Sequence, residues 1–167
     1  LGSGLREADV TLKTATLVYD KLARDGRFAP MLTANGTEYL KPSRRAARAK
    51  AAGAQLLLSI HLNYDADSRV SGFECCPATP QLSTNADSLR FARLVAEKFG
   101  AMGMELRGID GEEEIAAVTE EAADGKIVVA IDPGHGGVNP SVGSEDAGRL
   151  GSGLREADVT LKTATLV

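Results

Sequence analysis

Aromatic residues and cysteines are scarce in this sequence, and their scarcity argues against two classes of protein. Tryptophan is absent, and aromatic residues make up only 4% of the chain. Such a composition argues against a module whose main function is to stack rings on carbohydrate. The two cysteines, Cys75 and Cys76, are adjacent, and neighbours on a strand point to opposite faces, so a bridge between them would be strained. We therefore expect free thiols and no disulfide scaffold.

The chain also lacks an excess of positive charge and a long apolar run. Its formal net charge is −4, so binding to nucleic acid through phosphate contacts is not expected. No apolar run approaches the length of about 18 residues that a membrane span requires. The first residues, LGSGLREADV, do not have the pattern of a signal peptide. What remains, 43% hydrophobic and 25% charged residues, is the composition of an ordinary globular domain.

One segment of the sequence occurs twice without a difference. LGSGLREADVTLKTATLV fills residues 1–18 and again residues 150–167. An ancient duplication would have accumulated differences, so this repeat indicates either a circular permutant with overlapping ends or an artificial joining of the sequence. In circular order, one single domain spanning 1–167 would begin with residues 126–149 and continue with 1–111. Residues 112–125, which are rich in glutamate, would be a helical connector.

In this circular order, β-branched apolar runs alternate with amphipathic segments. Strands are predicted over 126–132, 29–34, 54–60 and 71–76, and helices over 7–24, 42–53 and 86–99. In the first helix, the predicted apolar face consists of Val10, Leu12, Leu17, Leu22 and Ala23. The alternation predicts an α/β fold: a single-domain sandwich whose central, mostly parallel sheet is flanked by helices, in a permuted chain order.

Both histidines of the chain follow apolar β-runs. His135 lies in IDPGHGG after one run, and His61 lies in SIHLN after another. Ligands of open α/β sheets bind beyond the carboxyl ends of the strands, so both imidazoles are predicted at one edge. Glu7, or its duplicate Glu156, begins the helix after the glycine-rich loop. Two imidazoles and one carboxylate, with a fourth position left to water, are the ligand set of a catalytic zinc site.

Other interpretations of these residues compete with a zinc site. A histidine in a turn is more often structural than a ligand, and a glutamate in the first turn of a helix is favoured by the helix dipole alone. PGHGG also has the glycines of a phosphate loop, but it lacks both G-K-[ST] and G-x-G-x-x-G. Spacing alone therefore leaves the choice between zinc and a structural role open.

Five segments together resemble the zinc-dependent N-acetylmuramoyl-L-alanine amidases of bacterial cell-wall remodelling and phage lysis. In circular order they are IVVAIDPGHGG, LREADVTLKTATLVYDKL, RRAARAKAAGAQLLLSIHLN, SGFECC and MGMELRGI. The resemblance covers nearly all of 126–149 and 1–110. It implies Zn²⁺ as cofactor and peptidoglycan as substrate, with hydrolysis of the amide between N-acetylmuramic acid and L-alanine. It also implies an extracytoplasmic site of action at the cell wall, as a host autolysin or a phage endolysin.

The resemblance assigns roles to individual residues. It implies that the zinc ligands are His135, His61 and the glutamate of LREAD, which is Glu7 or Glu156. Ser59 and Asn63 fall in the strand-end motif and are implied to shape the substrate-binding site. Arg45 matches a helix arginine of the family and is interpreted as a solvated or structural charge rather than a catalytic one. Glu74 matches a glutamate of the family's G-x-E strand and is interpreted as a supporting residue.

One part of the family pattern is missing. After RGI the family continues with a segment of the type V-L-R…P-A-V-L-V-E…G-F-x-S-N, which brings a strand, a catalytic glutamate and a last helix. Here RGID runs into GEEEIAAVTEE, and the general base and acid has no counterpart. Glu74 is only a weak candidate for that role, so hydrolysis is expected to be slow or absent even with zinc bound. The alternative function is an inactive or engineered permuted amidase module that binds zinc and self-assembles.

Only one copy of the repeat can supply the glutamate ligand. The first copy is continuous with YDKLARDG, so the helix over 7–24 can run unbroken. Using the copy at 150–167 would split that helix and add unsatisfied helix ends. We therefore expect Glu7 to act within its own chain. The other outcome is a domain-swapped homo-oligomer, in which 150–167 dock on a neighbouring chain.

Overall fold

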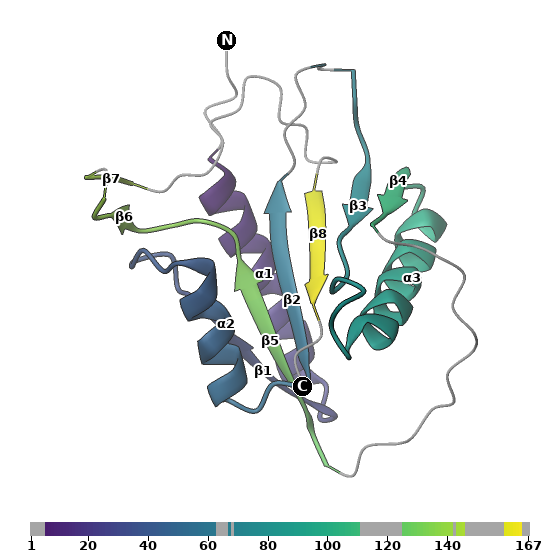
Figure 1. The fold of residues 1–167 in the computed structure, drawn as a ribbon, viewed down its shortest axis with the longest axis horizontal. Helices are drawn as coiled ribbons and strands as arrows, with labels where there is room; N and C mark the ends of the chain where they lie inside the picture. Colours follow the sequence, from purple (N-terminus) through teal and green to yellow (C-terminus); the bar gives the residue numbers. More distant parts are fainter. Residues whose placement is uncertain are drawn as a thin grey trace.

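The computed structural model describes residues 6–62, 67, 69–110, 125–141, 143–145 and 159–164. In these residues, helices cover both faces of a six-stranded sheet, as Figure 1 shows. The helices are α1 (Glu7–Arg24), α2 (Pro42–Ala51) and α3 (Asn85–Ala101). The strands of the sheet are β1 (Phe28–Leu32), β2 (Leu56–Leu62), β3 (Phe73–Cys75), β4 (Leu106–Ile109), β5 (Ile127–Pro133) and β8 (Val159–Ala164). A small hairpin is formed by β6 (Val138–Asn139) and β7 (Ser144–Glu145).

The sheet is mostly parallel, as the sequence predicts. Its strand order is β1-β5-β2-β8-β3-β4. Strand β5 pairs in parallel with both β1 and β2, and β3 pairs in parallel with β4. Strand β8 is the exception, because it runs antiparallel to β2. The prediction of a single-domain α/β fold with a central parallel sheet is thus confirmed for the described residues.

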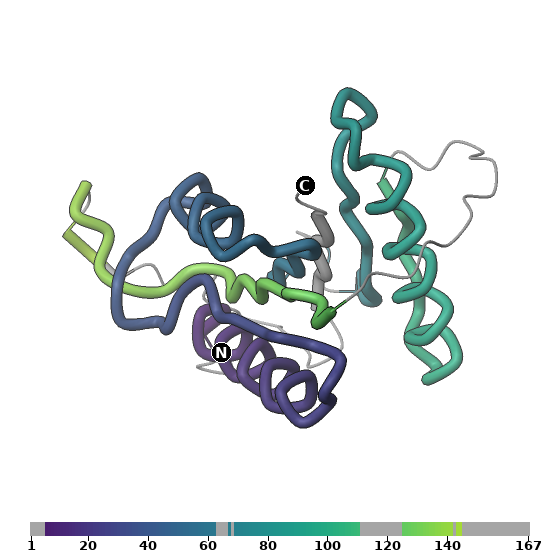
Figure 2. The backbone as a smooth tube through the Cα atoms, turned by 90° about the horizontal axis from the view of Figure 1, so that it is seen from below, coloured from purple at the N-terminus to yellow at the C-terminus, as the bar shows by residue number. Residues whose placement is uncertain are grey.

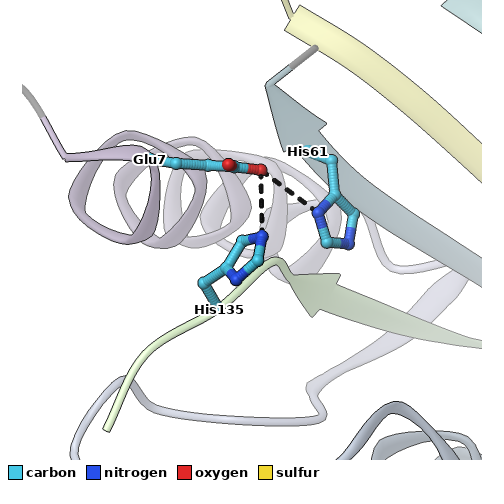
Figure 3. A group of neighbouring side chains, drawn as sticks. All are labelled: Glu7, His61 and His135. Carbon is cyan, nitrogen blue, oxygen red and sulfur yellow. Dashed lines mark hydrogen bonds and ion pairs between the residues drawn. The ribbon is translucent and has the colours of Figure 1, made fainter. Parts of the chain in front are cut away.

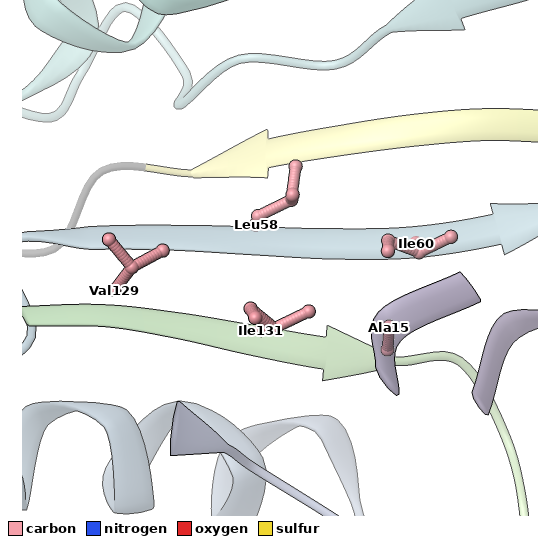
Figure 4. Close-up of a cluster of buried hydrophobic side chains, with 5 residues drawn as sticks. All are labelled: Ala15, Leu58, Ile60, Val129 and Ile131. Carbon is pink, nitrogen blue, oxygen red and sulfur yellow. The ribbon is translucent and has the colours of Figure 1, made fainter. Parts of the chain in front are cut away.

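The core lies on both faces of the central strands. On one face, Leu58, Ile60, Val129 and Ile131 pack against Ala15 of α1, as Figure 4 shows, and aromatic and aliphatic side chains of α3 join them. On the other face, Leu57 and Ala130 pack against Ala49 of α2. Figure 2 shows α1 and α2 on opposite sides of β5. Burial of both faces explains why these strands read as continuous apolar runs rather than as an alternating pattern.

Helix α1 has the predicted bounds, but its buried face differs from the predicted one. Leu17 is 56% exposed, whereas Ala8, Thr11 and Ala15 are buried. Small side chains on the buried face let the helix lie close to the strands beneath it. The prediction that Leu17 and Ala23 belong to the apolar face is therefore wrong, since both are exposed. Hydrophobicity alone does not show which face of the helix packs on the sheet.

Several elements differ from the sequence predictions. Strand β2 continues through His61 to Leu62, so His61 lies within the strand rather than after it. Strands β4, β6 and β7 were not predicted, since each is only two to four residues long. The predicted connector helix lies outside the described residues, apart from Gly125. None of the described helices is both long enough and apolar enough to cross a membrane.

The two copies of the repeat adopt different structures. VTLKTA is helical in α1 at residues 10–15 and forms β8 at residues 159–164. The sequence predicts the second copy either as an alternative to the helix or as a segment that docks on a neighbouring chain, and not as a strand of its own sheet. Instead, its backbone pairs with the edge of β2 that β5 leaves free. Local propensity therefore does not decide the structure of this segment, and its neighbours do.

Neither Cys75 nor Cys76 forms a disulfide, as the sequence predicts. Cys75 is fully buried on β3, and burial, with a smaller contribution from the nearby charge of Glu74, raises the pKa of its thiol to about 11. The thiol therefore stays protonated at neutral pH, which makes it a poor nucleophile and a poor metal ligand.

Two leucines of α3 test the placement of the core. Leu89 is 1% exposed, whereas Leu94 on the same helix is 48% exposed. Leu89→Ala should lower the free energy of unfolding by about 2–5 kcal/mol, because it removes buried methyl groups and leaves a cavity. Leu94→Ala should change it by no more than about 0.5 kcal/mol. Urea denaturation of the two variants measures both values, and equal losses would contradict the orientation of α3.

Candidate metal centre

The centre is built from three elements that meet at the carboxyl ends of β5 and β2. Glu7 is the first residue of α1, where the helix dipole favours a negative charge. His61 is the penultimate residue of β2, and His135 follows the end of β5 by two residues. Figure 3 shows the three side chains pointing toward one another. The structure therefore brings together the three residues that the sequence singled out.

One carboxylate oxygen is the centre of the group. Oε1 of Glu7 lies 3.2 Å from Nδ1 of His61 and 3.4 Å from Nε2 of His135. The same oxygen accepts a hydrogen bond of 3.0 Å from the backbone N–H of Leu62. The two imidazole rings meet edge to face, with their centroids 5.3 Å apart.

These distances fit a tetrahedral zinc ion. Bonds of about 2.0–2.1 Å to nitrogen and oxygen, at tetrahedral angles, place neighbouring ligand atoms about 3.3–3.4 Å apart. The two contacts of Glu7 already have this length, and one ligand atom from each residue lies within 4.8 Å of the others. Among the described residues, this is the group of histidine and carboxylate side chains that could hold a metal ion.

The three side chains of the group differ in how much of each is exposed to solvent. The side chain of Glu7 is 2% exposed, that of His61 is 20% exposed and that of His135 is 32% exposed. A buried carboxylate is costly unless positive charge or hydrogen-bond donors face it. Solvent reaches the imidazoles, so the centre is open on the histidine side. A catalytic zinc site needs such an open position.

The loop of His135 has a backbone that requires glycine around it. His135 itself has a φ of 64°, in the left-handed region that is unusual for a residue with a side chain. At Gly134, an added Cβ would lie 2.5 Å from Nδ1 of His61. At Gly137, which has a φ of 75°, it would lie 2.0 Å from the backbone nitrogen of Tyr39. The glycines of PGHGG therefore allow the loop to approach β2 and the 38–39 segment closely.

Three buried polar side chains that were not predicted as site residues support this loop, namely Asp132, Thr33 and Thr11. Asp132, which is 6% exposed, accepts hydrogen bonds from the hydroxyls of Thr33 and Ser59, the latter at 2.8 Å. Thr11 of α1 donates its hydroxyl hydrogen bond to the carbonyl oxygen of Gly134 at 2.7 Å. The signal for Thr11 is its spacing of four residues from Glu7, which places both on one helix face.

The remaining predicted site residues fall into two groups. Asn63 and Glu156 lie outside the described residues, so their roles stay predictions. Ser59 contacts Asp132, and its contact with substrate also stays a prediction. Glu74 is half-buried on β3, and β8 lies between β3 and β2. Two strand spacings of about 4.8 Å separate its backbone from the strand of His61.

The glycines of the PGHGG loop should contribute to the stability of the fold, which can be tested at Gly137. Gly137→Ala should lower the free energy of unfolding by more than about 1 kcal/mol, because the methyl group meets the backbone and the positive φ disfavours alanine. Gly100→Ala is the matched control within α3, where an added Cβ has no neighbour within 4 Å. It should raise stability by about 0.5–1 kcal/mol. Thermal melts of the two variants should therefore shift in opposite directions, and a stabilised Gly137→Ala would contradict the loop geometry.

Comparison with known proteins bears on the same segments. The family model of N-acetylmuramoyl-L-alanine amidase matches residues 1–124. The match includes Glu7 and His61 and ends before β5 and His135. It also extends over residues 112–124, which are predicted from the sequence to be a connector. No curated protein and no solved structure matches the chain. Because the family model covers well over half of its residues, the chain belongs to the N-acetylmuramoyl-L-alanine amidase family.

Proposed function

We propose that this protein is a zinc-dependent hydrolase of the amide between N-acetylmuramic acid and L-alanine in peptidoglycan. The observation that carries the proposal is the meeting of Glu7, His61 and His135 at one carboxylate oxygen. These residues come from three segments far apart in the sequence. Their number and type are those of catalytic zinc sites with one open position. Membership of the amidase family supplies the substrate class, and with it an extracytoplasmic place of action at the cell wall.

The three side chains would hold the metal, and the elements beneath them would orient it. Zinc held there would polarise the carbonyl of the scissile amide and lower the pKa of water to about 7. Glu7 would supply the negative charge from the buried side, while the more exposed imidazoles face solvent. The N–H of Leu62 fixes the carboxylate oxygen, so the ligand is oriented before the ion arrives.

We also propose that the chain is a circular permutant of the family fold. If β5 is counted first, the order of the strands along the circle is β5, β1, β2, and their order in the sheet is β1-β5-β2. The helices of the two connections, α1 and α2, then cover opposite faces. Ligands of such doubly wound sheets bind where the strand order reverses. That point lies between β5 and β2, the strands that carry the histidines. The end of the family match before β5 also supports a permuted order.

A second candidate function is a zinc-binding module that does not hydrolyse peptidoglycan. It is favoured by the lack of a second available carboxylate at the centre, within the part of the chain that the structure describes. Asp132 is close in sequence to His135, but its oxygens accept hydrogen bonds from Thr33 and Ser59. Glu74 lies beyond β8. Amide hydrolysis needs a group to move protons, and its loss typically costs 10²–10⁴-fold in rate, as an order of magnitude.

Measurements of zinc affinity test which copy of the repeat supplies the glutamate ligand. Glu7→Ala should lower zinc affinity by more than the roughly 10- to 100-fold that loss of an outer-shell partner costs. Glu156→Ala, the matched change in the second copy, should leave affinity unchanged, because the first copy forms α1. Competition with a chelating dye measures both affinities. Loss of zinc only with Glu156→Ala would overturn the assignment of Glu7.

The same preparations test hydrolysis on purified cell walls. Clearing of wall turbidity that stops on addition of a chelator and returns with zinc supports the amidase. Bound zinc without clearing supports the inactive module. Clearing that continues in a chelator, with Glu7→Ala as active as the parent, would overturn the zinc mechanism.

A further inference from the structure

The peptide group before Gly134 is held at both of its ends. Nη1 of Arg45 donates a hydrogen bond of 2.6 Å to the carbonyl oxygen of Pro133. The N–H of Gly134 donates one of 2.9 Å to the carbonyl oxygen of Ile60. The oxygen and the nitrogen of a single peptide group are therefore fixed by α2 and β2, one residue before His135.

Arg45 is itself buried and oriented. It is 6% exposed, and its Nε lies 3.4 Å from Oδ1 of Asp132. One guanidinium thus spans a carbonyl oxygen and a carboxylate oxygen of adjacent residues. The planar, forked guanidinium suits two acceptors in this way, whereas the single ammonium of lysine does not. A buried guanidinium is costly unless it is paired, so its position is tightly defined by these contacts.

The backbone conformation of His135 explains why these contacts of Arg45 are important. Its φ of 64° is a left-handed conformation that is unfavourable for a residue with a side chain. Without support the loop would relax toward ordinary values, and the imidazole would move away from Glu7. Helix α2 contributes none of the three proposed ligands, yet it supplies the side chain that fixes the peptide before His135.

We propose that Arg45 is a positioning residue for the metal ligand His135, acting through the carbonyl of Pro133 and the carboxylate of Asp132. This inference rests on the proposed zinc function and adds to it a residue that touches neither metal nor substrate. It replaces the interpretation of Arg45 as a solvated or structural charge. The prediction of a solvated charge is wrong, because Arg45 is buried between α2 and the end of β5. If Arg45 positions His135, then the geometry of the metal site, and not only the stability of the fold, depends on Arg45.

Three variants of α2 test the role of Arg45. Arg45→Met removes both contacts, Arg45→Lys keeps the charge but only one contact, and Arg44→Met is the control at an exposed neighbour on the same helix. Zinc affinity should fall about 10- to 100-fold in Arg45→Met, the usual cost of losing an outer-shell partner. It should fall less in Arg45→Lys and stay unchanged in Arg44→Met. The visible spectrum of bound Co²⁺ should shift in Arg45→Met.

The outcomes separate positioning from stability. If Arg45→Met folds and keeps the parent's zinc affinity and Co²⁺ spectrum, the proposal is overturned, even if the melting temperature falls. If Arg45→Met does not fold, parental affinity and spectrum in Arg45→Lys overturn it instead. If the parent binds no zinc, the proposed function fails, and amide exchange of Gly134 decides the positioning role alone. Faster exchange in Arg45→Met than in Arg44→Met supports positioning, and equal exchange overturns it.

A second inference rests on a separate observation, the strand formed by the duplicated segment. Strand β8 shares six register pairs with β2, whereas it pairs with β3 only at Cys75 and Leu161. It is the strand that joins the β1-β5-β2 part of the described sheet to β3-β4, as Figure 1 shows in yellow. Removing it would leave backbone groups of β2 and β3 without partners, and unpaired strand edges recruit other strands.

We infer that the gap between β2 and β3 is a binding site for one extended segment of the repeat sequence, occupied by residues 159–164 of the same chain. The first copy cannot occupy it, because residues 10–15 are part of α1. The site borders the candidate metal centre, since Thr160 is the register partner of His61. The backbone ladder of β8 therefore supports the strand that carries one histidine.

Proline substitution tests this strand in the full chain. Thr160→Pro and Leu161→Pro are made separately, because successive N–H groups of a strand point to opposite neighbours. At least one should speed amide exchange at residues 59–62 by tenfold or more. A synthetic peptide of residues 150–167 should bind that variant and restore protection, while a peptide carrying the same proline should not.

Two results would overturn the second inference. One is unchanged amide exchange of β2 in both proline variants. The other is exchange that increases but is not restored by saturating amounts of the unmodified peptide. A concentration-dependent dimer of the parent that the free peptide dissociates would overturn the assignment to the same chain, because the strand would then be supplied by a second copy.

Discussion

The centre depends on a single oxygen atom, Oε1 of Glu7, which three nitrogen atoms approach, two of them from β2 and one from the loop after β5. The N–H of Leu62 and the two imidazoles lie within 3.0–3.4 Å of it. A carboxylate that is only 2% exposed is costly in a protein interior unless charge or donors compensate it. Its position at the first residue of α1 supplies part of this compensation through the helix dipole. A dication between the carboxylate and the imidazoles would supply far more, which is the physical reason to regard this group as a metal centre.

Hydrogen bonds between the surrounding elements hold that oxygen and its neighbours in place. Thr11 ties α1 to the loop of His135, and Gly134 ties the same loop to β2. Beneath the loop, Asp132 collects hydrogen bonds from Ser59 and Thr33. Each tie is a single hydrogen bond worth about 1 kcal/mol net, but together they join every element that carries a ligand. The core clusters on both faces of β5 and β2 give these ties a rigid base.

The sequence predicts the helices and the longer parallel strands, and it predicts that Glu7, His61 and His135 lie close together, because both depend on local patterns. Apolar runs fix β5 and β2, and a histidine near the end of each run must lie near the same edge of a parallel sheet. Contacts over long distances in sequence are harder to predict. The buried face of α1 uses Ala8, Thr11 and Ala15 rather than Leu17, and hydrophobicity alone does not show this. The strand β8 was not predictable either, because the same six residues are helical elsewhere in the chain.

The most direct test of the account is the coordination of zinc in the loaded protein, measured by X-ray absorption at the zinc edge. Two imidazoles and light oxygen ligands at about 2.0–2.1 Å, with no sulfur, are the result expected for His61, His135 and Glu7. A sulfur ligand at about 2.3 Å would contradict the account, because it would place the metal on Cys75 or Cys76 instead. A spectrum of fully hydrated zinc would contradict it as well, since the centre would then hold no metal at all.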